Sequence, residues 1–294
     1  MSNSSNCLES SGEIWAQALD KYDYPYATVL ALSGGNDSRA AYYAAKALNI
    51  KIDYILHVNT RTGIQETTEW VRWFSNEYAQ VSYIEGDAGD TYQNYILRKG
   101  FFGKGTGQVN SAHSFAFRLL KRDVYVNALS RHIRKRKRNR KIFLLNGARL
   151  SESRNRSINL VAPVRADKLT SDGKDASSNI WVNLLQSWDK EDCEAICQEN
   201  NAPQNPVTQQ LCRSGECMCG TTQSQAERNQ AAAIYPEWGE WIDRLDRYGK
   251  ESFGFGWGEN APKTCLRSAG VQLDLFQPMC STCNHQASLQ NNEN

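Results

Sequence analysis

The stretch ATVLALSGGNDSRAAYYAAKAL, residues 27–48, decides the fold. Its first six residues are apolar and include β-branched side chains, which is typical of a strand buried on both faces. Two glycines follow, and then an alanine-rich run with apolar residues at helical spacing. The stretch therefore predicts a strand, a tight turn and a helix, the unit from which parallel sheets are built.

The turn SGGNDS, residues 33–38, has two interpretations. Its glycines permit positive φ and a close approach of the backbone to a ligand, and the helix start adds free N–H groups and a positive dipole end. With the hydroxyls of Ser33 and Ser38, these groups would form a cradle for phosphate. Alternatively, Asn36 or Asp37 simply caps the helix. The turn lacks the lysine of a Walker loop.

The rest of the chain continues the alternation of strands and helices. Further strands are expected at residues 51–58, 81–85, 142–146 and 180–185, and helices at residues 65–78, 112–132 and 189–199. Linkers are expected at residues 87–107, 167–178 and 200–207, and frayed ends at residues 1–12 and 285–294. This order predicts an α/β fold with a parallel sheet, whose ligands bind at the carboxyl ends of the strands.

Composition is ordinary for a soluble globular protein. The 294 residues are 40% hydrophobic and 22% charged, with a net charge of +2. No apolar run approaches the roughly 18 residues that span a bilayer, and the polar start MSNSSNCLESSGE lacks the apolar core of a signal peptide. We therefore expect a cytoplasmic protein with no membrane partner. Its nine cysteines should then be thiols or metal ligands.

The string SGGNDS after a buried strand resembles the PP-loop of the ATP pyrophosphatase superfamily. The resemblance implies an adenine nucleotide alpha hydrolase-like fold, a Rossmann-like parallel sheet. Its loop would bind the phosphates of ATP, or of the sulfonucleotides PAPS or APS. The family often has Lys where this chain has Asn36, and Mg²⁺ could supply the missing positive charge.

Four later segments follow the order of the PAPS reductase-like branch of that superfamily. They are HVNTRTGIQET (57–67), RLLKR (118–122), NGARLSESRNR (146–156) and LLQSWD (184–189). Each alone also fits a structural interpretation: a polar loop, a solvated basic helix face for Arg118, Lys121 and Arg122, or a helix cap at Asp189. Their order and spacing are more specific than any one of them, and the resemblance covers roughly residues 27–205.

The resemblance also assigns roles to residues. Arg149, Arg154 and Arg156 would donate to phosphate or sulfate oxygens, Gly147 would let the nucleotide approach the backbone, and Glu152 would hold an arginine. The residues expected to bind the nucleotide are Ser33, Gly34, Gly35, Asn36, Asp37, Ser38, Asn59, Gly147, Arg149 and Glu152. Those expected to carry the chemistry are Asp37, Ser38, Arg149 and Arg154.

The C-terminal part is rich in cysteine, with CRSGECMCG at residues 212–220 and CSTC at residues 280–283. Close thiols around glycine suit tetrahedral metal coordination. We expect a site made by Cys212, Cys217, Cys219 and Cys283, with Cys280 as a rival ligand. Spacing does not separate Zn²⁺ from a [4Fe–4S] cluster. A redox dithiol at residues 280–283, or buried cysteines that bind no metal, are the alternatives.

These observations divide the chain into a nucleotide-binding domain, residues 13–205, and a small Cys-rich metal-binding region, residues 206–294. Cys193 and Cys197, at helical spacing, are expected in a packed helix, and Cys7 in a loose terminus. The run RHIRKRKRNRK, from Arg131 to Lys141, has eight Lys or Arg in eleven residues. It suits the phosphates of nucleic acid, or it is a solvated helix end.

The tail lacks two signatures of reductases in this branch. It has neither the Glu-Cys-Gly-Leu-His of assimilatory PAPS reductases nor the adjacent Cys-Cys pair of APS reductases. It is more similar to PP-loop proteins of DNA phosphorothioation and related phage proteins. The resemblance thus favours adenylylation of a substrate, such as nucleic acid, for sulfur transfer from a donor protein. A sulfonucleotide reductase and a non-catalytic, zinc-stapled nucleic-acid-binding protein are the alternatives.

Overall fold

A computed structural model of the chain describes residues 3–105, 111–135, 140–152, 162–168 and 175–262. The chain forms two compact units, neither of which is continuous in sequence: residues 1–88 with 123–217, and residues 89–122 with 218–294. The expected division into domains 13–205 and 206–294 stays a prediction. No helix in the described ranges is both long and apolar enough to cross a bilayer.

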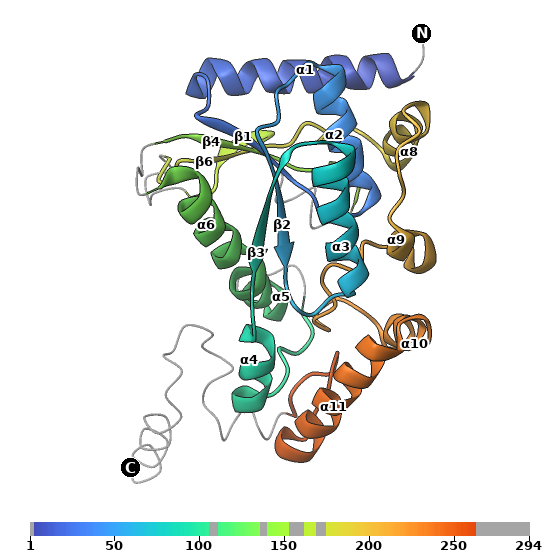
Figure 1. The fold of residues 1–294 in the computed structure, drawn as a ribbon. Helices are drawn as coiled ribbons and strands as arrows, with labels where there is room; N and C mark the ends of the chain where they lie inside the picture. The colour runs from blue at the N-terminus through green and yellow to red at the C-terminus, as the bar shows by residue number, and fades with distance from the viewer. Residues whose placement is uncertain (1–2, 106–110, 136–139, 153–161, 169–174, 263–294) are drawn as a thin grey trace. The chain divides into compact units, whose positions relative to one another are not determined.

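The first unit contains a six-stranded sheet with the strand order β3-β2-β1-β4-β6-β5 (Figure 1). All strand pairs are parallel except β5–β6, which is antiparallel. The strands are β1 (Ala27–Ala31), β2 (Tyr54–Asn59), β3 (Ser82–Asp87), β4 (Ile142–Leu145), β5 (Val164–Ala166) and β6 (Asn179–Val182). This confirms the expected α/β fold with a mostly parallel sheet, and adds the edge strand β5, which was not expected from the sequence.

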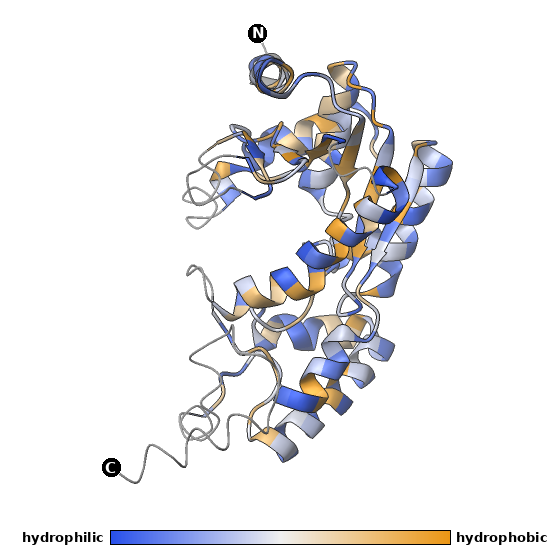
Figure 2. Ribbon diagram, turned by 90° about the vertical axis from the view of Figure 1, so that its left-hand side faces the viewer, coloured by the Kyte–Doolittle hydropathy of each residue, from blue (hydrophilic) through white to orange (hydrophobic). Residues whose placement is uncertain are grey.

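Helices cover both faces of this sheet. They are α1 (Asn3–Tyr22), α2 (Asn36–Ala47), α3 (Gln65–Trp73) with its π-helical extension η1 (Phe74–Tyr78), α6 (Asp123–Leu129) with η3 (Ser130–Arg134), α8 (Lys190–Glu199) and α9 (Pro206–Leu211). Successive residues of β1 point to opposite faces, so Leu30 packs in a core with α1, α2, α3 and α8. Val29 packs in a second core with α6. Apolar residues, orange in Figure 2, accordingly gather in the strands and on the covering helix faces.

Helix α1 overturns the expectation of a frayed segment at residues 1–12. Its buried side chains include Ser11 and Ile14, and Trp188 Nε1 donates hydrogen bonds to Ser11 Oγ (3.0 Å) and to the Cys7 carbonyl (3.1 Å). Cys7 therefore lies in a packed helix, not in a loose terminus. The prediction failed because a narrow apolar stripe is easily lost in a polar sequence.

The second unit is helical in its described part. It contains α4 (Thr91–Lys99), α5 (Ala112–Phe117) with η2 (Arg118–Arg122), α10 (Gln225–Ile234) and α11 (Pro236–Phe253). Tyr92 lies in its core, against Phe102 and Trp241, and α10 packs so closely on α11 that a Cβ on Gly239 would lie 2.8 Å from Ala232 Cβ. Helix α4 falls within the expected linker at residues 87–107, which is a correction. Residues 112–134 are helical throughout, as expected.

Candidate phosphate-binding site

The order of strands reverses between β1 and β4. The chain runs from β1 outward through β2 and β3, and then returns to place β4 on the other side of β1. In open parallel sheets this switch point is where ligands bind, beyond the carboxyl ends of the strands. The turn at residues 33–38 follows β1, and the segment from Asn146 to Arg149 follows β4, so both lie at this edge.

The turn after β1 leads into a helix that has no side-chain cap. Helix α2 begins at Asn36, and its N-cap is Gly35, with φ −83° and ψ 166°. The interpretation of Asn36 or Asp37 as a simple N-cap is therefore wrong, because both lie inside the first turn. Since the described loop offers no cap side chain to the N–H groups of that turn, they suit an anionic ligand.

The hydroxyl of Ser38 closes the turn. Its Oγ donates to the Gly35 carbonyl (3.0 Å) and accepts from the Ser33 N–H (3.3 Å). The hydroxyls of Ser33 and Ser38 also lie 3.2 Å apart. These bonds hold the backbone of the turn in one shape, which is the role that the structure supports for Ser38. Its expected part in the chemistry stays a prediction.

Gly34 is held from outside the turn, by residues that were not expected at this site from the sequence. Its φ is +82°, and its carbonyl accepts from Asn205 Nδ2 (3.1 Å) and Thr208 Oγ1 (3.0 Å). A Cβ at Gly34 would lie 2.8 Å from Asn205 Nδ2, so both the conformation and the contact require glycine. The Asn205–Pro206 pair could have predicted the start of α9, but not this contact with the turn.

Asp37 and Arg149 join the loops that follow β1 and β4. Arg149 Nη2 lies 3.0 Å from Asp37 Oδ2, and Arg149 Nη1 donates to Ser151 Oγ (2.9 Å). The Arg149 side chain is 8% exposed, and its Nε is buried with no hydrogen-bond partner. Burial opposes the charge of Arg149, but the hydrogen bond and charge of Asp37 outweigh burial, so the pKa of Arg149 is raised.

Gly147 brings the two loops into backbone contact. A Cβ at this position would lie 2.4 Å from the Asp37 carbonyl oxygen and 2.7 Å from the Ser38 nitrogen. Glycine is therefore required by the packing of one loop on the other. The expected role of Gly147, a close approach of the nucleotide, stays a prediction beside this structural one.

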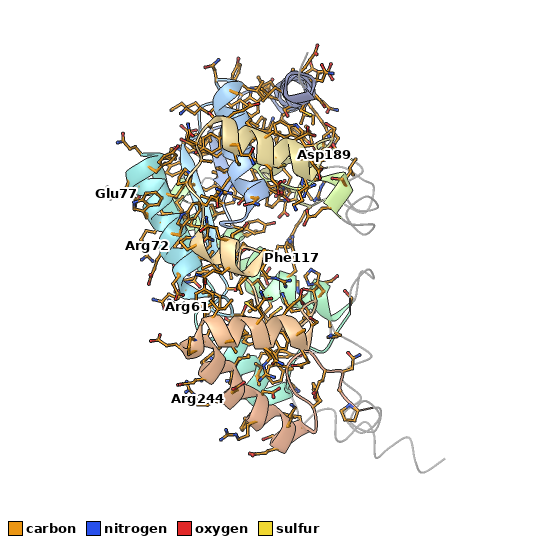
Figure 3. All side chains as sticks on the ribbon, turned by 90° about the vertical axis from the view of Figure 1, so that its right-hand side faces the viewer. Arg61, Arg72, Glu77, Phe117, Asp189 and Arg244 are labelled. Atoms are coloured by element: carbon orange, nitrogen blue, oxygen red, sulfur yellow. The ribbon has the colours of Figure 1, made fainter. Side chains whose placement is uncertain are left out.

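Three residues of the segment 146–156, Glu152, Arg154 and Arg156, were also expected at this site, and Asp189 was expected as a helix cap. Glu152 lies in the short helix η4 (Leu150–Glu152) and is exposed, while Arg149 binds Asp37 and Ser151. Arg154 and Arg156 lie outside the described residues. The capping interpretation of Asp189 is confirmed, because its side chain accepts from the Asp192 N–H (2.8 Å) at the start of α8 (Figure 3).

Asn59 lies at the carboxyl end of β2 and lines a pocket of about 250 Å³. Its Nδ2 donates to Glu85 Oε1 (3.0 Å), and Arg72, which projects from α3 in Figure 3, lies 2.8 Å from Glu85 Oε2. Burial would raise the pKa of Glu85, but its hydrogen bonds from Arg72 and Asn59 lower it. Asn59 is thus engaged with β3, and its contact with a nucleotide stays a prediction.

The first part of the cysteine-rich segment is fixed at the same edge of the sheet. Its backbone carbonyls accept hydrogen bonds from the loop after β2 and from α3. These bonds are Ile64 N–H to Gly215 O (2.8 Å), Thr60 Oγ1 to Glu216 O (2.8 Å) and Thr67 Oγ1 to Ser214 O (2.5 Å). The Thr62 hydroxyl also lies 3.7 Å from Cys217 Sγ. No local pattern in the sequence predicts these contacts.

The metal site remains untested. Cys212 is exposed at the end of α9, Cys217 is partly buried and Cys219 is buried. In the described ranges, no three His, Cys, Asp or Glu side chains lie close enough to hold an ion. Cys283 and its rival Cys280 lie outside those ranges, so the four-cysteine ligand set stays a prediction. Cys193 and Cys197 lie in helix α8 with their side chains buried in the core, as expected.

Several cations of the basic run from Arg131 to Lys141 contact the protein itself. Arg134 is 8% exposed and donates to Asn179 Oδ1, and burial lowers its pKa. Lys141 Nζ donates to the Tyr22 carbonyl (2.8 Å). The interpretation of a solvated helix end is therefore wrong for Arg134, whereas the Lys141 side chain is 42% exposed. Residues 136–139 of the run lie outside the described part, and the nucleic-acid partner stays a prediction.

Comparisons with known proteins give structural similarity only. No family model and no curated protein matches the chain. It is similar to a PAPS reductase from Candida auris (14% identity, TM-score 0.43, covering 68% of this chain and 83% of that one). It is also similar to the NH3-dependent NAD synthetase of Campylobacter jejuni (14% identity, TM-score 0.43, covering 86% of this chain and 95% of that one). A third similar structure is the U34-tRNA thiolase NcsA of Methanococcus maripaludis with its [4Fe–4S] cluster (14% identity, TM-score 0.42, covering 83% of this chain and 75% of that one). At these values the matches indicate no substrate or reaction.

Proposed function

We propose that this chain is a PP-loop enzyme that binds ATP at residues 33–38 and adenylylates an acceptor for sulfur transfer. One observation carries the proposal: the pairing of Asp37 with Arg149 at the switch point, beside a helix start with no side-chain cap. The pair places a buried cation and a carboxylate where the N–H groups of α2 begin.

Three groups at this edge of the sheet would bind different parts of the nucleotide and its Mg²⁺. The first turn of α2 binds the pyrophosphate part of the nucleotide through its N–H groups and positive dipole end. Arg149 supplies positive charge, which Asn36 does not. Asp37 is 28% exposed and has the oxygen ligands that Mg²⁺ prefers, so a nucleotide-bound Mg²⁺ would supply the remaining charge.

The reaction is a displacement at the α-phosphorus. An acceptor oxygen attacks this atom, the bond from the α-phosphorus to the bridging α–β oxygen breaks, and pyrophosphate leaves with the bonding electrons. Arg149 and the N–H groups of α2 stabilise the charge that grows on the leaving group. A sulfur nucleophile from a donor protein then attacks the acceptor carbon that carries the adenylylated oxygen. The carbon–sulfur bond forms as the carbon–oxygen bond breaks, and AMP leaves with this oxygen.

The cysteine-rich segment completes the proposal. The ligands are Cys212, Cys217, Cys219 and either Cys283 or Cys280, and the bound group is a [4Fe–4S] cluster or Zn²⁺. The proposal is supported by the hydrogen bonds that fix residues 214–216 at the edge of the sheet. Anaerobic purification with metal analysis tests it: iron with broad absorption near 400 nm supports the cluster, and zinc alone removes it.

The nucleotide chemistry is tested by pyrophosphate release from ATP, and by equilibrium binding of ATP. Arg149→Gln should weaken ATP binding at least tenfold, because it removes the buried cation. The control is Arg72→Gln, which removes an arginine of the same unit that pairs with Glu85.

Thioredoxin-dependent sulfite release from PAPS without pyrophosphate release would instead identify a reductase. Salt-sensitive nucleic-acid binding that is unchanged in Asp37→Asn would indicate a non-catalytic protein.

A further inference from the structure

A larger cavity of the first unit adjoins the turn at residues 33–38 through Asn36. It has a volume of about 390 Å³ and is lined by the start of α2, by residues 193–198 of α8 and by residues 201–209. Its lining combines one guanidinium, that of Arg39, with amide side chains that include Gln198 and Gln204. The buried thiols of Cys193 and Cys197 also line it. Nothing in the nucleotide chemistry described above uses this cavity.

Arg39 is 4% exposed, yet its charge has no carboxylate partner in the described part of the chain. Its Nη1 donates to the Pro203 carbonyl (2.6 Å) and its Nη2 to Asn36 Oδ1 (2.6 Å), and both acceptors are neutral. Its Nε is buried with no hydrogen-bond partner. Glu194 also lines the cavity, but its Oε1 lies 3.4 Å from Lys190 Nζ and forms no ion pair with Arg39.

The position of Arg39 makes this charge costly. A buried cation without a counter-charge is strongly destabilising. Arg39 also lies in the first turn of α2, where the positive end of the helix dipole disfavours a cation. The carbonyl end of α8 offers only partial negative charge. A bound ligand that carries a negative charge would compensate the buried charge of Arg39.

The donors of Arg39 select the ligand group. A guanidinium has five N–H donors, of which Arg39 uses two, so three have no acceptor in the described protein. A guanidinium pairs well with a planar, singly charged carboxylate. A doubly charged phosphate would leave negative charge uncompensated, because Arg39 is the only cation in the described lining and Glu194 adds an acid.

We propose that this cavity binds a small molecule through its carboxylate group, with Arg39 as the counter-charge. The amide side chains around the cavity, which both donate and accept hydrogen bonds, contact the polar remainder of the ligand. The volume is at the lower end of the range for small-molecule sites. The site adjoins the proposed ATP loop through Asn36, but its charged group is Arg39, and the proposal does not depend on the ATP chemistry.

The test is a titration of the ¹⁵N-labelled full-length protein with sodium acetate and sodium propionate at constant ionic strength. Saturable shifts are expected for the backbone amides of residues 201–209, apart from Pro203 and Pro206, which have no N–H. Arg39→Gln, which removes the charge and keeps an amide, should weaken this binding at least tenfold, while the control Arg72→Gln should leave it unchanged. Inorganic phosphate should mainly shift residues 33–38, with smaller shifts at Asn205 and Thr208, which bond to the Gly34 carbonyl.

Two results would overturn the proposal: amides of residues 201–209 that respond to neither carboxylate, or an Arg39→Gln variant that binds as tightly as the parent. If Arg39→Gln does not fold, Ala202→Trp replaces it in the titration, because it keeps Arg39 and fills the cavity. Loss of the shifts in Ala202→Trp supports the site, and their persistence contradicts it. A strong shift of residues 201–209 by phosphate alone would also count against a carboxylate site.

Discussion

Arg149 Nη2 and Asp37 Oδ2 lie 3.0 Å apart and join two loops that are 112 residues apart in the chain. The two side chains are 8% and 28% exposed, so solvent screens this pair less than it screens an exposed pair. Arg149 has no other acid within ion-pair distance among the described residues. The pair therefore both neutralises a buried cation and fixes the two loops at the switch point of the sheet.

Removing the carboxylate should leave Arg149 buried and uncompensated. We expect Asp37→Asn to lower the free energy of unfolding by about 1–3 kcal/mol in urea denaturation. A double-mutant cycle with Arg149→Gln should give a coupling energy of about 0.5–3 kcal/mol. The exposed pair of Lys190 and Glu194 is the control, since Lys190→Gln should cost less than about 0.5 kcal/mol. Strictly additive effects of the two substitutions would refute a direct interaction.

The close packing of the two loops gives a second prediction. Gly147→Ala places a Cβ 2.4 Å from the Asp37 carbonyl oxygen, so the loops must separate. We expect a loss of about 1–3 kcal/mol in stability and weaker ATP binding. Gly12→Ala, within helix α1, is the matched control. Its Cβ would lie 3.5 Å from Cδ2 of Leu48, the C-cap of α2, which is an ordinary van der Waals contact. This control should leave ATP binding unchanged and raise stability by up to about 1 kcal/mol.

Features set by neighbouring residues could be predicted from the sequence, and features set by distant ones could not. The strand, turn and helix of residues 27–48 follow from local apolar patterns, as does the cap at Asp189. The bond from Asn205 to the Gly34 carbonyl joins residues 171 apart, and no local pattern encodes such a contact. The partners of Asn59 and Arg149 were missed for the same reason, because Glu85 lies on strand β3 and Asp37 in helix α2.

Burial of Cys197 predicts a dependence of stability on pH. Burial raises the pKa of its thiol from the ordinary 9.0 to about 11, so the folded state holds this proton more tightly than the unfolded state. The stability from this group is complete below pH 9 and falls as the pH rises toward 11. Urea midpoints between about pH 8 and 10.5 should decline more in the parent than in Cys197→Ala. An equal decline in both proteins would contradict this assignment.

The same thiols should resist alkylation in the folded protein. Burial raises the pKa of Cys193 as well, while Cys212 is exposed. With iodoacetamide at about pH 8, after removal of any bound metal by a chelator, mass spectrometry of the peptides should show Cys212 modified before Cys193 and Cys197. Cys193 and Cys197 should be modified at a comparable rate only in denaturant. Rapid modification of Cys193 without denaturant would show that this part of the core opens.

Asn205 makes one hydrogen bond to the Gly34 carbonyl and another that caps α9, and substitutions can remove them separately. The bond to the Gly34 carbonyl is called the tie below. Its Oδ1 accepts from the Val207 N–H (3.1 Å) as the cap, while its Nδ2 donates to the Gly34 carbonyl (3.1 Å). Asn205→Asp keeps the cap acceptor but places a carboxylate against that carbonyl, whereas Asn205→Ala removes both functions. If the tie shapes the loop, Asn205→Asp should weaken ATP binding at least as much as Asn205→Ala, measured by calorimetry. An Asn205→Asp variant that binds ATP like the parent, with Asn205→Ala merely less stable by about 1 kcal/mol, would leave Asn205 only its role as a helix cap.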